Sequence, residues 1–268
     1  QARPPRHPNP RTPPVPHPAF QLCAARAIAG ADAPARHLRH RRTGAEVLVL
    51  PAAGAERVFA LSLAAPVPDG SGVAHVLEHL VFRGSRRFGC DDLFGALHQA
   101  VALGDLNATT TQDRTGFHLS CGSEPDLSAA IEVLADAVFA PLLSAPAFEA
   151  ERAVIRNEMR GYRAAPGNAI AQALRAGLND APPYGVDHGG TAEGLAQLTL
   201  DVLRAFHRRM YRADRARIFL AGDVDLVARL AQIDRLLPDL PGAAPPDPPL
   251  LRRAFAAPWR YLVLGGLY

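Results

Sequence analysis

Residues 75–79 read HVLEH, an H-x-x-E-H pattern, and no other feature constrains the fold of this chain so strongly. The pattern lies inside a mostly apolar segment, residues 72–85 (GVAHVLEHLVFRGS). On a helix, residues four apart lie on one face, so His75 and His79 can bind the same metal ion. Glu78 points to the same side and can take a proton from an attacking water molecule. The segment is therefore expected to form a helix that presents two metal ligands and a base.

A third metal ligand has to come from elsewhere in the chain, because a catalytic zinc site usually has three protein ligands and one open position. A predicted helix over residues 147–163 offers the carboxylates of Glu149, Glu151 and Glu158. Glu151 and Glu158 are seven residues apart, which places them on one helical face together with Val154 and Ile155. Burying an unpaired carboxylate on an apolar face is costly, and a metal ion or a histidine partner would remove that cost. Spacing alone leaves Glu151 and Glu158 as competing candidates.

The composition is that of a globular protein with a substantial core. The chain has 268 residues, of which 48% are hydrophobic, enough for one large domain or two small ones. No apolar run approaches the roughly 20 residues that span a bilayer, and residues 1–19 contain no apolar signal segment. We therefore expect neither a membrane segment nor a secretory signal.

Cysteine and arginine usage indicate the compartment. Three widely spaced cysteines fit a reducing environment better than a disulfide framework. All 29 basic residues are arginine, which we interpret as the coding bias of a GC-rich genome. We expect a cytoplasmic, bacterial protein. Organellar import is less favoured, because the prolines of the N-terminal segment would break the amphipathic helix of a transit peptide.

Charge is distributed unevenly along the chain. Residues 1–45 hold eight arginines and one acidic residue, Asp32, a balance of +7 that leaves −4 for the rest of a chain whose net charge is +3. An acidic body would attract basic peptides, although a solvated arginine-rich tail without electrostatic purpose explains the asymmetry equally well. Nucleic-acid binding would rest on this charge alone, without a binding motif, so we expect no nucleic-acid partner.

The pattern predicts three regions: a leader rich in proline and arginine (1–19), a globular domain (20–236), and a proline-rich linker that opens a further segment (237–268). Strands are predicted at 46–51, 57–64, 106–111, 115–121 and 217–221. Besides the motif helix, helices are predicted at 91–103, 125–139, 147–163, 168–178, 200–211 and 226–236. Strands and helices that mix without regular alternation favour an α+β fold.

Several ordered blocks resemble the pitrilysin (M16) family of inverted-motif zinc peptidases, in particular its presequence-protease and falcilysin-like branch. The blocks are residues 40–45 (HRRTGA), 72–85, 106–109 (LNAT) with 113–115 (DRT), 136–141 (DAVFAP), the pair Glu151 and Glu158, 184–187 (YGVD) with 189–190 (GG), and 206–207 (FH) with Tyr211. The resemblance implies a mostly antiparallel β-sheet flanked by helices.

The resemblance also implies residue roles. His75, His79 and Glu158 would bind one zinc ion, and Glu78 would be the general base. Glu151 would support the site without binding metal, through a hydrogen bond to a ligand imidazole. Asn107 and Ala108 would lie on an edge strand that pairs with the substrate backbone. The remaining histidines, His98, His118, His188 and His207, are expected to be structural or surface residues.

The implied activity is that of a zinc-dependent endopeptidase, or of its catalytic half, acting on short, unfolded, basic peptides. Members of the family enclose peptides between two homologous halves, and this sequence corresponds to the first, zinc-bearing domain only. We therefore expect a second half-domain, supplied in trans or by a homo-oligomer. The alternative is a non-catalytic or incomplete subunit that binds peptide or scaffolds a partner half.

Overall fold

Alternating apolar residues form the central strands of the sheet. In β4 (Arg57–Ala64) the side chains of Phe59, Leu61 and Leu63 are buried, while the residues between them are partly exposed. Side chains alternate between the two faces of a strand, so these three residues point into one core. The computed structural model describes residues 17–240, with the exception of residues 30, 32 and 179–181.

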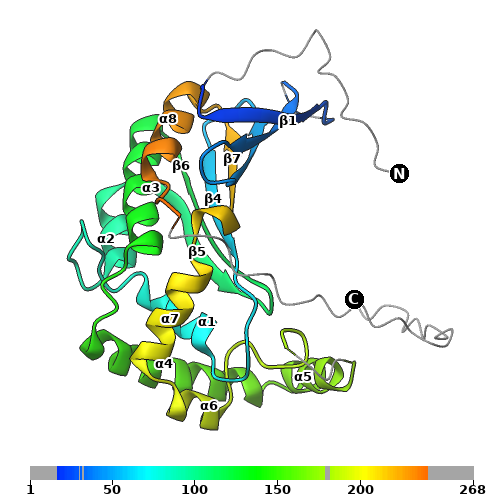
Figure 1. Ribbon diagram of the computed structural model, residues 1–268, viewed down its shortest axis with the longest axis vertical. Coiled ribbons are helices and arrows are strands. Elements are labelled where there is room, and N and C mark those ends of the chain that lie inside the picture. The colour runs from blue at the N-terminus through cyan, green and yellow to red at the C-terminus, as the bar shows by residue number, and fades with distance from the viewer. Residues whose placement is uncertain (1–16, 30, 32, 179–181, 241–268) are drawn as a thin grey trace, which may run out of the picture.

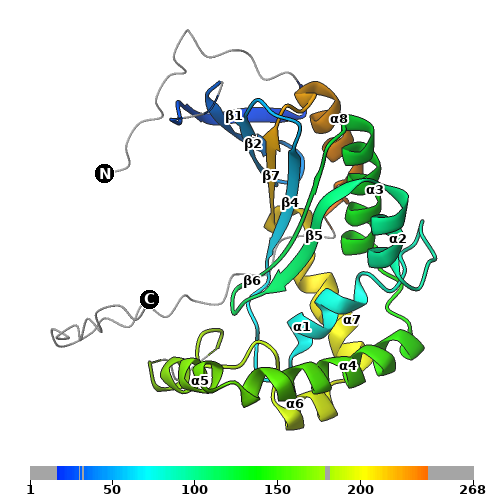
Figure 2. The same cartoon turned by 180° about the vertical axis from the view of Figure 1, so that it is seen from behind.

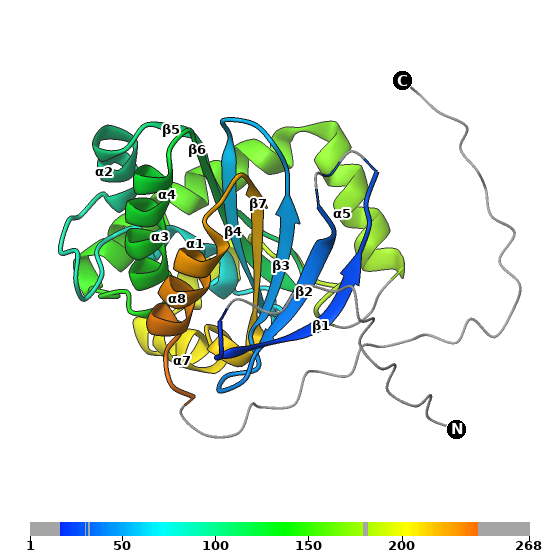
Figure 3. The same cartoon turned by 90° about the horizontal axis from the view of Figure 1, so that it is seen from above.

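The described strands form one seven-stranded sheet in the order β1-β2-β3-β7-β4-β6-β5. They are β1 (Phe20–Arg26), β2 (Ala35–His40), β3 (Glu46–Pro51), β4, β5 (Leu103–Thr110), β6 (Arg114–Cys121) and β7 (Ala216–Gly222). All neighbours are antiparallel except β3 and β7, which run parallel. The prediction of an α+β fold with a mostly antiparallel sheet is confirmed. Figure 3, seen from above, shows the strands from β6 across to β1.

The described helices are α1 (Val73–Leu80), α2 (Leu93–Ala100), α3 (Glu124–Phe139), α4 (Ala145–Ala164), α5 (Pro166–Leu178), α6 (Ala192–Gln197), α7 (Leu200–Met210) and α8 (Leu226–Leu236), with a 3-10 turn η1 (Ala213–Arg215). Helices α2, α3 and α8 lie along one face of the sheet (Figures 1 and 2). Helix α1 contacts α4, α7 and the strands β5 and β6. The motif helix therefore lies between the edge of the sheet and α4, which places the site at one end of the fold.

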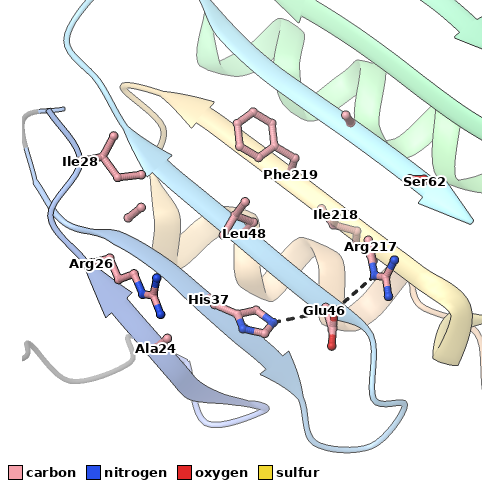
Figure 4. A pocket seen from close by; sticks show the side chains of 12 residues that line it. Ala24, Arg26, Ile28, His37, Glu46, Leu48, Ser62, Arg217, Ile218 and Phe219 are labelled. Atoms are coloured by element: carbon pink, nitrogen blue, oxygen red, sulfur yellow. Dashed lines mark hydrogen bonds and ion pairs between the residues drawn. The ribbon is translucent and has the colours of Figure 1, made fainter. Parts of the chain in front are cut away.

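The opposite face of β1, β2, β3 and β7 carries no helix in the part of the chain that the structure describes (Figures 1 and 2). A shallow, largely apolar groove of about 560 Å³ runs over this face (Figure 4). It includes Leu48 and Phe219, and Leu48 is 46% exposed. The groove shares no residue with the H-x-x-E-H helix, so it is separate from the candidate site.

Two strands of the sheet were not predicted. The sequence of β1, FQLCAAR, buries only Phe20 fully, because β1 is an edge strand with one neighbour. The sequence of β2, ARHLRH, consists mostly of arginine and histidine, so polar and apolar residues do not alternate regularly along it. Neither segment shows the period-two hydrophobic pattern on which strand prediction depends.

The predicted helix over 91–103 is too long. Helix α2 ends at Ala100, since Val101 already has extended backbone angles, and β5 begins at Leu103. Helix α6 and the turn η1 were not predicted, because six and three residues are too few to show a helical period. The other predicted elements occur within a few residues of their expected bounds.

Residues 1–16 and 241–268 lie outside the described part, so the predicted leader and linker, and the domain limits drawn from them, stay predictions. Cys23, Cys90 and Cys121 are free thiols. Among the described helices, none combines the length and apolar character needed to cross a membrane.

A charged cluster joins α3 to α8 on the helical side of the sheet. Glu132 of α3 accepts hydrogen bonds from Arg235 and Gln232 of α8 and from Arg87. Burial alone would raise the pKa of Glu132, but these hydrogen bonds outweigh it and lower the pKa from 4.5 to about 2. A carboxyl group with a lowered folded-state pKa stabilises the fold above its unfolded pKa, and this contribution is lost as the pH falls toward the folded value.

Replacement of Glu132 by Gln is therefore expected to lower the free energy of unfolding by about 1 kcal/mol at pH 7. The difference from the wild type should shrink as the pH falls below 4.5 toward about 2. Urea unfolding at pH 7 and at about pH 3.5 measures both values. Glu149→Gln, which removes an exposed carboxylate paired with Arg152, is the control. A pH-independent difference would contradict the prediction.

Candidate metal centre

The position of α1 follows from its apolar spacing. Val73, Val76, Leu77 and Leu80 recur at helical intervals and are all buried in the core. The opposite side of the helix carries His75 and His79, whose imidazole rings lie with centroids 5.0 Å apart. The core thus fixes the rotation of α1, and the rotation turns both histidines toward α4.

His75, His79 and Glu158 form a group whose possible ligand atoms all lie within 4.8 Å of one another. The Nε2 atom of His75 is 3.7 Å from Oε1 of Glu158, and Nε2 of His79 is 3.6 Å from Oε2 of Glu158. A tetrahedral ion with bonds of about 2.0–2.1 Å to nitrogen and oxygen separates its ligand atoms by about 3.3 Å. Two imidazoles and a carboxylate at this spacing fit a divalent metal ion with an open coordination position.

His75 is in the protonation state that metal binding requires. Burial, followed by the neighbouring His79 and His188, lowers the pKa of His75 to about 4, and Asp187 opposes this shift. The imidazole is therefore neutral at pH 7, so its nitrogen lone pair is available to a metal ion.

The structure distinguishes the two glutamates that spacing left as competitors. Oε2 of Glu151 is 3.0 Å from Nδ1 of His79, and Oε1 of Glu151 is 3.4 Å from Nε of Arg83. The Glu151 side chain is 11% exposed, whereas that of Glu158 is 50% exposed. Glu151 thus lies at Nδ1 of His79, which leaves Nε2 of that ring free, while Glu158 lies near Nε2 of both imidazoles.

One detail of the predicted helix face was wrong. The buried face of α4 is formed by Phe148, Glu151, Ile155 and Met159, and Val154 is 51% exposed. Val154 lies outside this buried face, and Glu158 lies at its margin. Glu158 is therefore not a buried charge on an apolar stripe, contrary to the expectation.

Glu78 lies beside the metal-ligand group and against the sheet. It is buried, and burial raises its pKa, while hydrogen bonds with the side chain and backbone of Thr110 on β5 lower it. A carboxylate with a raised pKa is a better proton acceptor near neutral pH. Sequence reasoning missed Thr110, because only the pairing of β5 with the rest of the sheet brings it to α1.

Asn107 and Ala108 both lie on β5, the edge strand of the sheet that contacts α1. They pair with His118 and Phe117 of β6, so the outer side of β5 has no neighbouring strand among the described residues. The backbone N–H of Ala108 donates a hydrogen bond of 2.8 Å to Oδ1 of its neighbour Asn107. The strand expected to receive substrate is thus open on one side and lies beside the motif.

Three of the other histidines take ordinary positions. His207 is hydrogen-bonded to the backbone carbonyl of Val138, His118 pairs with Asp105, and the His98 ring lies against Phe94. His188 differs, because it lies near enough to His75 to lower the pKa of that residue. Its position follows from the loop after α5, for which the sequence gives no local geometric signal.

Comparison with known proteins places this arrangement in a family. Residues 64–185 match the family described as insulinase (peptidase family M16), and residues 197–260 match the domain described as peptidase M16 inactive domain. The chain belongs to peptidase family M16. The first match includes the whole H-x-x-E-H helix and α4, so it covers the candidate metal centre.

Among its relatives, the chain is similar to presequence protease 1, chloroplastic/mitochondrial, of Arabidopsis thaliana, with 31% identity over 216 residues. This match covers 74% of the chain and 20% of the relative. The mitochondrial presequence protease of Danio rerio is 31% identical over 215 residues, covering 74% and 21%. The chain thus spans about a fifth of the length of these curated relatives.

Solved structures share the fold. Pitrilysin superposes with a TM-score of 0.73 at 24% identity, covering 85% of this chain and 25% of that one. A protease from Helicobacter pylori gives a TM-score of 0.68 at 22% identity, covering 76% and 51%. The sheet and helices described above are therefore an arrangement that M16 proteins have in common.

The metal group predicts a graded response to mutation. Glu158→Ala should abolish tight binding of a divalent metal, since it removes one of three ligands. Glu151→Ala should weaken binding by about 10- to 100-fold, since it removes only the partner of His79. Glu149→Ala, on the same helix but outside the group, should leave affinity unchanged. Competition with a chromophoric chelator measures all three, and equal affinities for the Glu158 and Glu149 variants would refute the assignment.

Proposed function

We propose that this chain is a zinc-dependent endopeptidase or the catalytic half of one. The observation that carries the proposal is the meeting of His75, His79 and Glu158 at ligand spacing, with Glu78 adjacent on the same helix. The donor set of two imidazoles and one carboxylate is typical of catalytic zinc. Membership of family M16 supports a peptidase, and the zinc ion, the substrate and the completeness of the site belong to the proposal.

In this proposal a bound zinc ion supplies Lewis acidity, which makes water more acidic and a peptide carbonyl more electrophilic. The chain's own residues do the rest. The Glu78 carboxylate accepts a proton from the attacking water and later donates it to the leaving amine. Burial raises the pKa of Glu78 and Thr110 lowers it, and Glu151 holds the ring of His79. Of the two imidazoles, the His79 ring thus has a second residue that orients it.

The substrate class follows from the edge strand. We propose that an extended peptide adds to the open side of β5 at Asn107 and Ala108, where backbone hydrogen bonds would align it with Glu78. An unfolded segment presents its backbone in this way along its whole length. The acidic balance of the chain beyond residue 45 favours basic peptides.

The partner is a further part of the proposal. Because the chain spans about a fifth of its curated relatives, we propose that a second M16-type half completes the substrate chamber. A cytoplasmic, bacterial location also stays a prediction. The relatives include proteins named for mitochondria and chloroplasts and an uncharacterized protein of the bacterium Borreliella burgdorferi.

Glu78→Gln tests the chemistry. The variant should lose hydrolysis of a fluorogenic basic peptide while it keeps zinc, because glutamine preserves the shape of the side chain but cannot accept the proton. Zinc content is measured in the same preparations, and Glu149→Gln is the matched control, which should retain both properties. Normal turnover by the Glu78 variant would contradict the assignment of the base.

The wild-type chain in the same assay distinguishes the alternative function. If the chain binds zinc but hydrolyses no peptide, whatever the length of the peptide, the result would favour the non-catalytic or incomplete subunit. Turnover that depends on Glu78 would favour the endopeptidase.

A further inference from the structure

The segment 184–191, which we name the bridge segment, contacts the β5–β6 hairpin, the start of α1, and the helices α4 and α5. Tyr184 donates a hydrogen bond of 3.0 Å to Asp113, and His188 lies 3.3 Å from Nε2 of Gln112. Asp113 and Gln112 form the turn between β5 and β6. The bridge segment therefore touches the hairpin that contains the proposed substrate strand.

Asp187 is the buried centre of this segment. Its side chain is 3% exposed and accepts three hydrogen bonds. Nη2 of Arg163 donates to Oδ2 at 3.0 Å, Nε2 of Gln172 donates to the same oxygen at 3.1 Å, and the N–H of Gly189 donates to Oδ1 at 3.1 Å. Arg163 lies at the end of α4 and Gln172 lies on α5, so one carboxylate joins both helices to the bridge segment.

The two glycines that follow Asp187 pack directly against the start of α1. Gly190 has φ of 83°, and a Cβ there would lie 2.7 Å from Cα of Gly72, the N-cap residue of α1. Gly72 itself has φ of 73°, and a Cβ there would lie 2.9 Å from the carbonyl oxygen of Gly189. Only glycine allows this backbone approach. Three residues beyond Gly72 is His75.

The same glycines also pack against α4. A Cβ at Gly189 would lie 2.2 Å from Cε of Met159, the residue directly after Glu158. Arg163 donates a second hydrogen bond to the carbonyl of Gly190, and the N–H of Thr191 donates to the carbonyl of Gly70 at 2.8 Å. The bridge segment thus packs between Gly72, the N-cap residue of α1, and the turn of α4 that carries Glu158.

We propose that Asp187 is a positioning residue for the metal centre: by holding Arg163 and the Gly189-Gly190 backbone together, it sets the distance between α1 and the Glu158 turn of α4. This role rests on the proposed zinc site. Asp187 itself is not assigned as a ligand. Loss of its hydrogen bonds would let the α4 end move away from α1, which would widen the separation of Glu158 from the two imidazoles.

Asp187→Asn in the full chain tests the role, since asparagine keeps the volume but loses the charge and one acceptor. We expect zinc affinity, measured by chelator competition, to fall by about 10- to 100-fold. The visible absorption of the cobalt-loaded protein should also change, because it reports ligand geometry. Arg163→Gln should reproduce both effects, and the double variant should lose little more than either single one. If Asp187→Asn does not fold, Arg163→Gln alone still tests the role.

Glu132→Gln is the matched control, because Glu132 also accepts hydrogen bonds from arginine and glutamine side chains and joins two helices, neither of which is α1 or α4. It should leave zinc affinity and the cobalt spectrum unchanged. If Asp187→Asn and Arg163→Gln bind zinc as the wild type does, the positioning role is wrong and the zinc site stands. The role is also wrong if the control weakens binding equally. If the wild type binds no zinc, the proposed function fails and the role falls with it.

Discussion

The candidate site depends on the packing of α1 against α4. His79 and Glu151 are 72 residues apart in the chain, and their hydrogen bond exists because the apolar faces of the two helices share one core. Leu77 and Leu80 fix the rotation of α1, as Ile155 and Met159 fix that of α4. A one-residue change of helical phase turns a side chain by about 100°, which would take Glu158 away from both imidazoles. The core therefore sets the rotation of both helices, and with it the direction in which His75, His79 and Glu158 point.

The charges of the site are compatible with this burial because they occur in partnered sets. Glu151 is enclosed between His79 and Arg83, and burial raises the pKa of Glu78, which Thr110 and His79 both lower. An isolated buried carboxylate would be costly, whereas one with a cation or several donors is tolerated. Glu158 needs less compensation, since its side chain is half exposed. Glu158 is thus both the most solvent-accessible of these carboxylates and the one nearest to the Nε2 atoms of the two imidazoles, so an ion can reach it from solvent.

The sequence was sufficient where the relevant interaction is local. His75, Glu78 and His79 lie within one helical turn, and the alternation in β3 and β4 identifies those strands directly. It was insufficient where the interaction is long-range. Spacing did not separate Glu151 from Glu158, since the distinction depends on which imidazole nitrogen each one faces. The edge strand β1 has little apolar pattern because little of it is buried. Asp187 lay in a recognised block, but its partners on α4 and α5 emerge only from the fold.

The hydrogen bond between Asn107 and Ala108 affects how the edge of β5 can pair with another strand. An edge strand offers unpaired N–H and C=O groups to any other strand, including the edge of a second copy of the same chain. At Ala108 the N–H is already engaged by the neighbouring Asn107 side chain. A strand that approaches must displace this internal acceptor and gains less than it would at a bare edge. At Ala108 the edge is therefore less open to another strand, and a strand that binds there has to offer contacts that compete with the Asn107 side chain.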